Sequence, residues 1–276
     1  MEILDFLKNK DVDTDDLISM LFADYQQRKK EDTLYSKDDY IPQNLIQIYF
    51  QTADHLPFDE IVENFKKKYI YNENKLENVH EKEEQAGLGE VYDFVRSDKY
   101  TNCNNPFIIL IIHKLLYSKC PYPEFGGAFR NNQAMIEGSD VKTSDPTHIS
   151  GDVGQLMPQY NELLKMAEEI NNNKQELIIP YIDKVLEMKC RLVEIHPFGD
   201  GNGRTMRALV NMMFKMINLP PIYVEAKEKK EYIQAMDQAI REKDTSSIKK
   251  FYYYKICDSI VELDINKRAK GISTRH

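Results

Sequence analysis

Apolar residues recur at intervals of three and four along most of the chain, which is the spacing of one face of an α-helix. This pattern predicts helices near residues 13–30, 45–50, 58–71, 90–95, 106–117, 157–170, 181–195, 204–217, 227–241 and 245–264. A polar, acid-rich stretch over residues 72–85 interrupts the pattern, and no internal repeat is found. The chain is therefore predicted to be a mostly α-helical bundle.

One segment departs from this periodicity. Pro, Gly and Asn cluster between residues 121 and 150, and the helical spacing is lost there. Residues 126–130 and 133–136 lie on either side of Asn131 and Asn132, which predicts two short strands joined as a β-hairpin. The predicted fold is a helical bundle with one small hairpin.

The predicted helix over residues 204–217 has apolar side chains around most of its circumference, which is typical of a buried central helix. Its polar residues Arg204, Arg207, Asn211 and Lys215 are three or four positions apart and share one stripe. A buried arginine requires an anionic partner. A ligand or an acidic lid is therefore expected beside these two arginines.

Composition narrows the functional classes. A length of 276 residues suits one large domain or two small ones, and the net charge of −8 argues against broad binding to nucleic acid or anionic membranes. The four cysteines are widely separated, as expected for free thiols in a reducing compartment. The start of the chain has no features of a signal peptide, and the longest apolar run, residues 107–112, cannot span a bilayer. We expect a cytoplasmic protein with neither nucleic acid nor membrane as partner.

The strongest chemical signal is a loop of nine residues that runs from His196 to Arg204, with the sequence HPFGDGNGR. Its glycines stand at alternate positions (199, 201 and 203), so the backbone can turn tightly and approach a ligand. The loop leads into the buried helix. Free N–H groups and the helix dipole at such an N-terminus favour an anion. His113, on an apolar helix, is by contrast interpreted as a hydrogen-bonded core residue.

The side chains of the loop suit the handling of a nucleotide triphosphate. Asp200 is its only carboxylate and can bind Mg²⁺, which prefers one or two carboxylates together with phosphate oxygens. Asn202 can donate to a phosphate oxygen, and Arg204 and Arg207 can neutralise the distal phosphates. His196 can take a proton from an incoming hydroxyl near neutral pH.

These residues, together with Arg207, resemble the signature HPF-x-(D/E)-GNGRxxR of the Fic (Fido) family at every position. The resemblance implies an adenylyltransferase that moves AMP from ATP to a Ser, Thr or Tyr hydroxyl of a protein and releases pyrophosphate, and this chain itself is one candidate target. It implies that His196 is the general base, Asp200 the Mg²⁺ ligand and Asn202 a contact to the α-phosphate. Arg204 and Arg207 are implied to bind the β- and γ-phosphates, beside the amides of Gly201 and Gly203. The related Doc toxins, which are kinases, have a lysine in place of the second motif glycine, so Gly203 argues against phosphorylation.

Two further stretches resemble parts of the family. The segment with Gly127, Arg130, Met135 and Ile136 is similar to the flap, a hairpin that holds the target peptide by strand addition; an ordinary surface hairpin is the alternative. Residues 74–78 resemble the inhibitory motif (S/T)xxxE(G/N), which implies that Glu77 pairs with Arg207 and blocks the γ-phosphate. Here the Ser/Thr position is Glu73, an acid that cannot supply the usual hydroxyl. The alternative is that Glu77 belongs to a solvated acidic run.

The predicted organisation is an N-terminal helical region over residues 1–100 with the inhibitory segment at about 72–80, a Fic domain over 101–260, and a C-terminal tail over 261–276. Three alternatives to AMP transfer to a target stay open. They are removal of AMP from a modified protein, transfer from another nucleotide donor, and ATP binding without turnover by a regulatory protein.

Overall fold

The computed structural model describes residues 22–27, 29, 30, 43, 45, 46, 49, 58–97, 105–136 and 138–269. Much of the predicted helices over residues 13–30 and 45–50, together with Cys103 and the end of the predicted tail, lies outside these residues. No helix within these ranges is long and apolar enough to cross a membrane. The three described cysteines, Cys120, Cys190 and Cys257, are buried and form no disulfide.

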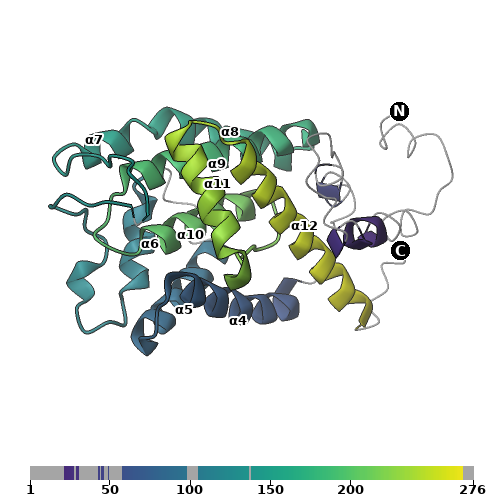
Figure 1. Ribbon diagram of the computed structural model, residues 1–276. Coiled ribbons are helices and arrows are strands. Elements are labelled where there is room, and N and C mark those ends of the chain that lie inside the picture. The colour runs from purple at the N-terminus through teal and green to yellow at the C-terminus, as the bar shows by residue number, and fades with distance from the viewer. Residues whose placement is uncertain are drawn as a thin grey trace.

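The fold is mostly α-helical, as the sequence predicts (Figure 1). From residue 58 onward, the described part of the chain forms the helices α4 (Phe58–Glu77), α5 (Lys82–Arg96), α6 (Ile108–Leu116), α7 (Ile149–Gly154), α8 (Met157–Asn171), α9 (Ile178–Ile195), α10 (Asn202–Met216), α11 (Lys229–Arg241) and α12 (Ser246–Ala269). Three short 3-10 turns, at Pro123–Phe125, Gln175–Leu177 and Ala226–Glu228, join some of them.

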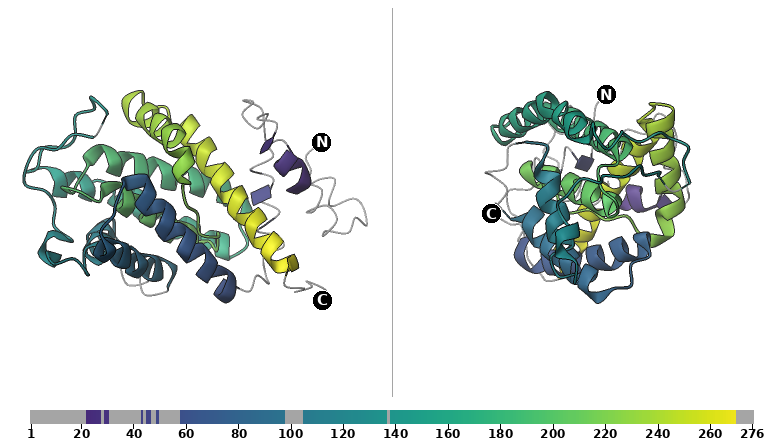
Figure 2. Two further views of the ribbon diagram at one scale, coloured as in Figure 1. Left: turned by 60° about the horizontal axis from the view of Figure 1, so that its bottom comes forward. Right: turned by 90° about the vertical axis from the view of Figure 1, so that its left-hand side faces the viewer.

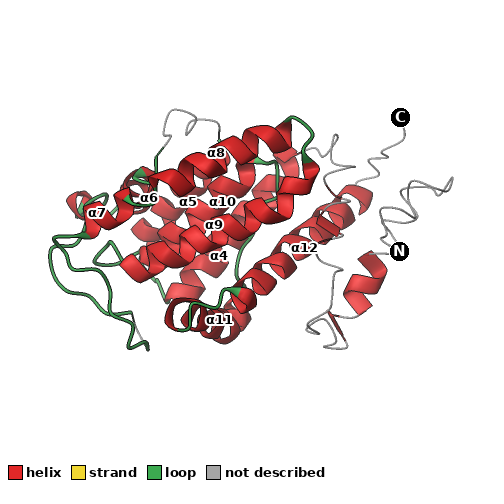
Figure 3. Cartoon of the chain, turned by 90° about the horizontal axis from the view of Figure 1, so that it is seen from above, coloured by secondary structure: helices red, strands yellow, loops and turns green. Residues whose placement is uncertain are grey.

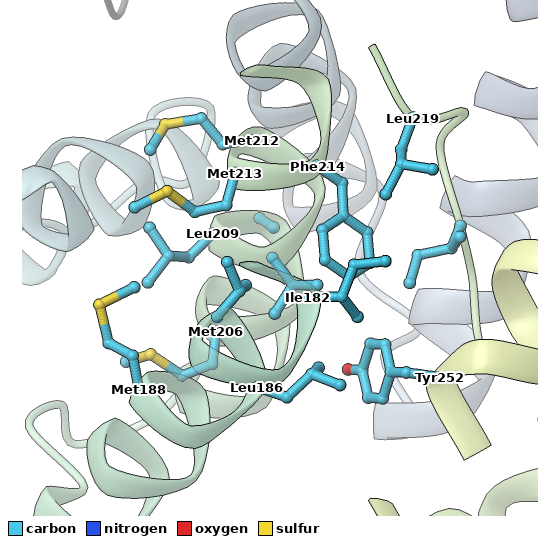
Figure 4. Close-up of a cluster of buried hydrophobic side chains, with 14 of the residues drawn as sticks. Ile182, Leu186, Met188, Met206, Leu209, Met212, Met213, Phe214, Leu219 and Tyr252 are labelled. Carbon is cyan, nitrogen blue, oxygen red and sulfur yellow. The ribbon is translucent and has the colours of Figure 1, made fainter. Parts of the chain in front are cut away.

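Helix α10 lies at the centre of the bundle, as its all-round apolar sequence predicts. It packs against α9, α5, α6 and α4, and Figure 2 shows it surrounded by other helices. Every residue from Arg204 to Phe214 is buried. Met206, Met212 and Met213, with Leu209 and Phe214, lie in one buried cluster with Ile182, Leu186 and Met188 of α9 (Figure 4). The N-terminus of α10, where the signature loop ends, is therefore fixed by the best-packed part of the core.

The polar stretch over residues 72–85 is helical at both ends, which corrects the sequence-based boundaries. Helix α4 continues to Glu77, and α5 begins at Lys82 instead of residue 90. The error has a physical cause: several buried positions there are polar, namely Glu73, Asn74 and Glu84. Two of these acids face arginines of α10, so the buried face of each helix carries charge and the apolar periodicity fades.

The predicted hairpin over residues 126–130 and 133–136 is wrong. Neither segment forms a strand in the described part of the chain, and the one isolated β-bridge there pairs Met135 with Lys142, in the antiparallel sense. Figure 3 shows this region as loop. Residues 126–130 cannot pair with 133–136 because their backbone is already bound elsewhere: the Arg130 amide donates to the Pro197 carbonyl at 2.9 Å.

A single hydrophobic core contains residues from both of the main predicted regions, from Tyr25 to Val261. Helices α4 and α5, from the predicted N-terminal region, contact α10 directly. Helix α12 continues past the predicted start of the tail at residue 261. The division at residue 100 remains a prediction about organisation, and the contacts across it bring α4 to the signature loop.

Candidate active site

His196 stands where α9 ends and the loop begins. Its backbone is in the left-handed region (φ 52°), and its amide donates to the Leu192 carbonyl at 3.0 Å, so it terminates the helix. The ring Nδ1 is buried and makes no hydrogen bond of standard geometry. Burial, and next the charge of Arg130, lower the pKa of His196 below its ordinary value. The imidazole is therefore neutral near pH 7, and its other nitrogen, Nε2, is the one able to accept a proton.

Arg130 holds this corner together. Its Nε donates to the His196 carbonyl at 2.7 Å, and its Nη2 lies 3.4 Å from the Ile195 carbonyl and 2.6 Å from that of Ser144. These contacts satisfy carbonyls that a helix leaves unpaired at its C-terminus. The guanidinium is buried and each of its nitrogens is bound, so the Arg130 side chain supports the loop from within the protein, and its place in a target-docking flap stays a prediction.

His113 joins α6 to the loop on the opposite side. Its Nδ1 accepts the Gly127 amide at 2.9 Å, and its Nε2 lies 3.0 Å from the Asp200 carbonyl, so the ring is the neutral Nε2–H tautomer. Its ring stacks on Phe198, with centroids 3.8 Å apart and planes 4° apart. Burial lowers the pKa of His113 to about 4. The predicted core role is confirmed, and the residue also ties Gly127 to the signature loop.

The loop closes on itself before α10 begins. The Asn202 side chain accepts the Phe198 amide at 2.9 Å and donates to the Phe198 carbonyl at 2.8 Å. Gly201 has φ 71°, a conformation that glycine adopts without strain. The first hydrogen bond of the helix runs from the Thr205 amide to the Gly201 carbonyl, so the preceding amides have no partner within the helix. Free amides at a helix N-terminus favour an anion, so the geometry is compatible with the anion site that the glycine pattern predicts.

A carboxylate of α4 lies beside this N-terminus. Glu77 Oε1 accepts from Arg207 Nη2 at 2.5 Å. A Cβ added to Gly203 would stand 2.3 Å from the same oxygen and 2.9 Å from Arg207 Nη1. Burial raises the pKa of Glu77, but the charges of Arg207 and Arg204 outweigh burial and the net pKa is lowered. Glu77 is therefore an anion at neutral pH, seated against Gly203.

Glu73 contacts the same arginine from one turn earlier in α4. Its two oxygens lie 3.0 and 2.7 Å from Arg207 Nε, and it is completely buried. Burial raises the pKa of the Glu73 carboxyl, against the opposing effect of Arg207. The sequence analysis identified this residue only as a departure from a motif. Its spacing of four from Glu77, which puts both on one helical face, is the signal that could have found the contact.

The other signature arginine has its own partner. Arg204 Nη1 lies 2.5 Å from Glu84 of α5, and Nη2 donates to the Tyr117 hydroxyl at 3.2 Å. The same hydroxyl donates to Asp200 Oδ2 at 3.0 Å. Asp200 is the exposed member of this chain of contacts, with 66% of its side chain accessible. The buried acids that the arginines of α10 require are therefore Glu73 and Glu84, and the partly exposed Glu77 is a further partner of Arg207.

A pocket of about 240 Å³ opens between these groups. Its lining includes His196, Asn202, Gly203 and Arg207, together with Glu77. Apolar side chains, among them Ile136, Val193, Met236 and Ile240, line it too, with the polar side chains of Ser139 and Asp237. Lys229, at the start of α11, also lines it, and the sequence analysis did not single this residue out. The pocket thus combines charged and apolar side chains, as a nucleotide site requires.

The structure separates the four predicted flap residues. Ile136 lines the pocket, whereas Met135 is 86% exposed. Gly127 (φ 80°) packs close to α6, where an added Cβ would stand 3.0 Å from the Leu110 carbonyl oxygen. Gly127 and Arg130 thus anchor the segment, and Met135 and Ile136 lie at its free end.

Comparison with known proteins agrees with this geometry. Residues 105–214 match the family model described as "Fic/DOC family", and the match contains the whole signature loop. The chain carries a Fic domain. Two relatives are named protein adenylyltransferase Fic: one from Aedes aegypti (30% identity over 152 residues) and one from Nematostella vectensis (24% over 225 residues). These matches cover 51% and 73% of this chain but only 27% and 49% of the relatives, so the chain spans at most about half their length.

Solved structures show the same fold. A Fic-domain-containing signalling protein from Bacteroides thetaiotaomicron superposes with a TM-score of 0.67 at 17% identity, over 85% of this chain and all of that one. A fragment of Fic-1 from C. elegans superposes with a TM-score of 0.59 at 16% identity, over 92% of this chain and 89% of the fragment. At these identities the likeness concerns the fold, and it includes segments on both sides of the matched Fic domain.

The chemistry of the donor groups suits a hard divalent cation. Asp200 presents an exposed carboxylate at the edge of the loop, and no group of three metal-ligating side chains exists among the described residues. A site with one protein carboxylate is the arrangement in which Mg²⁺ binds through phosphate oxygens and water. The residues therefore fit a metal that arrives with a nucleotide.

Proposed function

We propose that this protein transfers AMP from ATP to a hydroxyl group of a protein, and that Glu77 holds the reaction in check. The observation that carries the proposal is the meeting of three groups at one helix N-terminus: neutral His196, the free amides of α10, and Arg207. The matched family model and the names of the relatives support the same reaction class.

In this proposal the acceptor oxygen attacks the α-phosphorus of ATP. The bond from the α-phosphorus to the bridging oxygen breaks, pyrophosphate leaves, and the hydroxyl proton moves to Nε2 of His196. The lowered pKa of His196 keeps that nitrogen free of a proton at neutral pH. Because Arg130 binds the His196 carbonyl, the backbone that carries the ring is already held in place before the acceptor arrives.

The phosphates lie along the amides of α10, with Arg204 and Arg207 on the distal side. Asp200 would hold Mg²⁺, which when bound supplies positive charge to the phosphate oxygens. The nucleoside lies against apolar side chains of the pocket lining, among them Ile136 and Met236. The site cannot receive the terminal phosphate while Glu77 is present, because its carboxylate takes the space at Gly203 and one nitrogen of Arg207.

Label transfer tests the reaction class. Wild type, Glu77→Gly and Glu77→Gly with His196→Ala are each incubated with Mg²⁺ and ATP labelled at the α- or the γ-phosphate. We expect Glu77→Gly to incorporate the α-label into protein, itself included, and wild type to incorporate much less. Adding His196→Ala should abolish incorporation while ATP still binds.

Three results would contradict the proposal. Incorporation of the γ-label would indicate a kinase. ATP binding to Glu77→Gly without transfer to itself or to a cell extract would favour a regulatory nucleotide-binding protein. Release of AMP from a modified protein, in place of its attachment, would reverse the direction of the reaction.

A further inference from the structure

We propose that Glu73 is a positioning residue, which aims Arg207 at the phosphate site, and is not a second inhibitory acid. The inference rests on the proposed function, because it assigns a role within the same site. It assigns different roles to two glutamates that contact the same guanidinium and carry the same type of side chain.

The two carboxylates take different nitrogens of Arg207. Glu73 is bound to Nε by both of its oxygens, at 3.0 and 2.7 Å, whereas Glu77 accepts from Nη2 at 2.5 Å. The guanidinium is planar, so an acceptor fixed at Nε sets the direction of the other two nitrogens. Glu73 can therefore orient the group without occupying the nitrogens at its end.

Those end nitrogens face the place where a phosphate would bind. Nη1 would be 2.9 Å from a Cβ on Gly203, so it lies directly beside the N-terminus of α10. Nη2 becomes available once Glu77 leaves. With Nε held by Glu73, Nη1 and Nη2 together offer the two-pronged face that arginine presents to phosphate oxygens.

Burial separates the two acids further. The Glu73 side chain is 1% exposed, whereas that of Glu77 is 34% exposed and lines the pocket. Glu77 is the last residue of α4 and is followed by Asn78 in the left-handed region (φ 56°). Glu73 lies a full turn inside the helix, next to buried Asn74. Glu77 can swing away at the helix end, whereas removing Glu73 would require α4 to unwind or shift.

Glu73 also changes what Arg207 contributes to binding. With Glu77 gone, the charge of Arg207 is balanced by Glu73 and that of Arg204 by Glu84. The arginines then supply directed hydrogen bonds to the phosphates, while the net attraction comes from the α10 N-terminus, Lys229 and the metal. A second inhibitor would instead predict that deleting Glu73 frees Arg207 and strengthens ATP binding.

The test uses the full chain with Glu77→Gly as background, so that the competing acid is absent. Glu73→Ala and Glu73→Gln are added separately, and binding of ATP and of AMP is measured by calorimetry. We expect Glu73→Ala to weaken ATP binding about tenfold or more and to leave AMP binding unchanged, because AMP lacks the distal phosphates. Glu73→Gln, whose amide oxygen can still accept from Nε, should bind ATP at least as well as the background. If Glu73→Ala binds ATP as tightly as Glu73→Gln, or more tightly, the inference is overturned.

A second measurement does not depend on nucleotide. The ¹⁵N-bound Nε proton of Arg207, assigned by its loss in Arg207→Lys, should be protected from exchange in wild type and Glu77→Gly and lose protection in Glu73→Ala. Loss of protection in Glu77→Gly would refute the positioning role, whatever the enzyme does. A protected proton in a chain that transfers no AMP would sink the proposed function and leave the geometry of Glu73 standing. Thermal melting of each variant excludes unfolding as the cause.

Discussion

Gly87 is the point of closest approach between α5 and α6, and its replacement gives a sharp test of how α5 is placed. A Cβ on Gly87 would stand 2.0 Å from the Leu116 carbonyl oxygen and 2.8 Å from its carbon. Backbone atoms cannot rotate aside as a side chain can, so Gly87→Ala forces the two helices apart by at least about 1 Å, the shortfall from the 3.0 Å below which Cβ contacts are essentially never found. Overpacking of this kind costs about 1–3 kcal/mol.

Gly89 supplies a matched control in the same helix. A Cβ there would meet only side-chain atoms, Ile70 Cδ1 at 3.7 Å and Lys66 Cε at 3.9 Å. Alanine is favoured over glycine in a helix interior by about 0.5–1 kcal/mol. We therefore expect Gly89→Ala to raise the free energy of unfolding and Gly87→Ala to lower it, with a gap of about 1–3 kcal/mol between the variants, because the gain in helix propensity is common to both.

Urea unfolding followed by circular dichroism measures this gap. The consequence should reach the site, because Glu84 lies one turn before Gly87 and is the buried partner of Arg204. Gly87→Ala should therefore also weaken ATP binding in a Glu77→Gly background, and Gly89→Ala should not. Equal stabilisation by both alanines would refute the close packing of α5 on α6.

Three further predictions concern Arg130, Phe198 and Glu77, which lie in or beside the signature loop. Arg130→Gln should destabilise the fold by about 2–4 kcal/mol, because carbonyls of α9 lose their donor, and should raise the pKa of His196, because a nearby cation is removed; an unshifted NMR titration of His196 would contradict this. Phe198→Ala should lower the free energy of unfolding by about 3–5 kcal/mol, whereas replacing the half-exposed Phe125 by alanine should lower it by less than about 1 kcal/mol. Thermal or urea unfolding measures both, and equal losses would show that Phe198 does not hold the loop to the core. Folding lowers the pKa of Glu77, so its contact with Arg207 stabilises the protein fully above the ordinary carboxyl pKa near 4.5, and this contribution is lost as pH falls through the lower folded pKa. The difference in the free energy of unfolding between wild type and Glu77→Gln should therefore stay constant from pH 5 to 8 and shrink only in stronger acid. A difference that shrinks already near pH 6 would contradict the lowered pKa.

The sequence predicts well those parts in which apolar periodicity and burial coincide. Helices α8 to α12 follow from their apolar spacing, and the buried α10 follows from apolar residues all round it. The chemistry of the loop is also legible, because His196, Asp200 and the glycines are close together in the chain. The demand of Arg204 and Arg207 for acidic partners follows from burial alone, and the structure supplies those partners.

The partners themselves were harder to identify. Glu73 and Glu84 lie 134 and 120 residues before the arginines they contact, so no local spacing connects them. Both belong to a polar stretch that periodicity interprets as a break between helices. The failed hairpin has a similar origin: the Gly127 and Arg130 amides are bound by His113 and Pro197, and these long-range contacts override a good local turn signal.

The central claim is that the Glu77 carboxylate occupies the place of the terminal phosphates, beside Gly203 and Arg207. The most direct test compares the affinities of ATP and AMP for wild type, Glu77→Gln and Glu77→Gly, measured by calorimetry with Mg²⁺. We predict that Glu77→Gly gains affinity for ATP and keeps that for AMP, with Glu77→Gln between wild type and Glu77→Gly for ATP. Equal ATP affinity in all three proteins, or an equal gain for AMP, would contradict the claim.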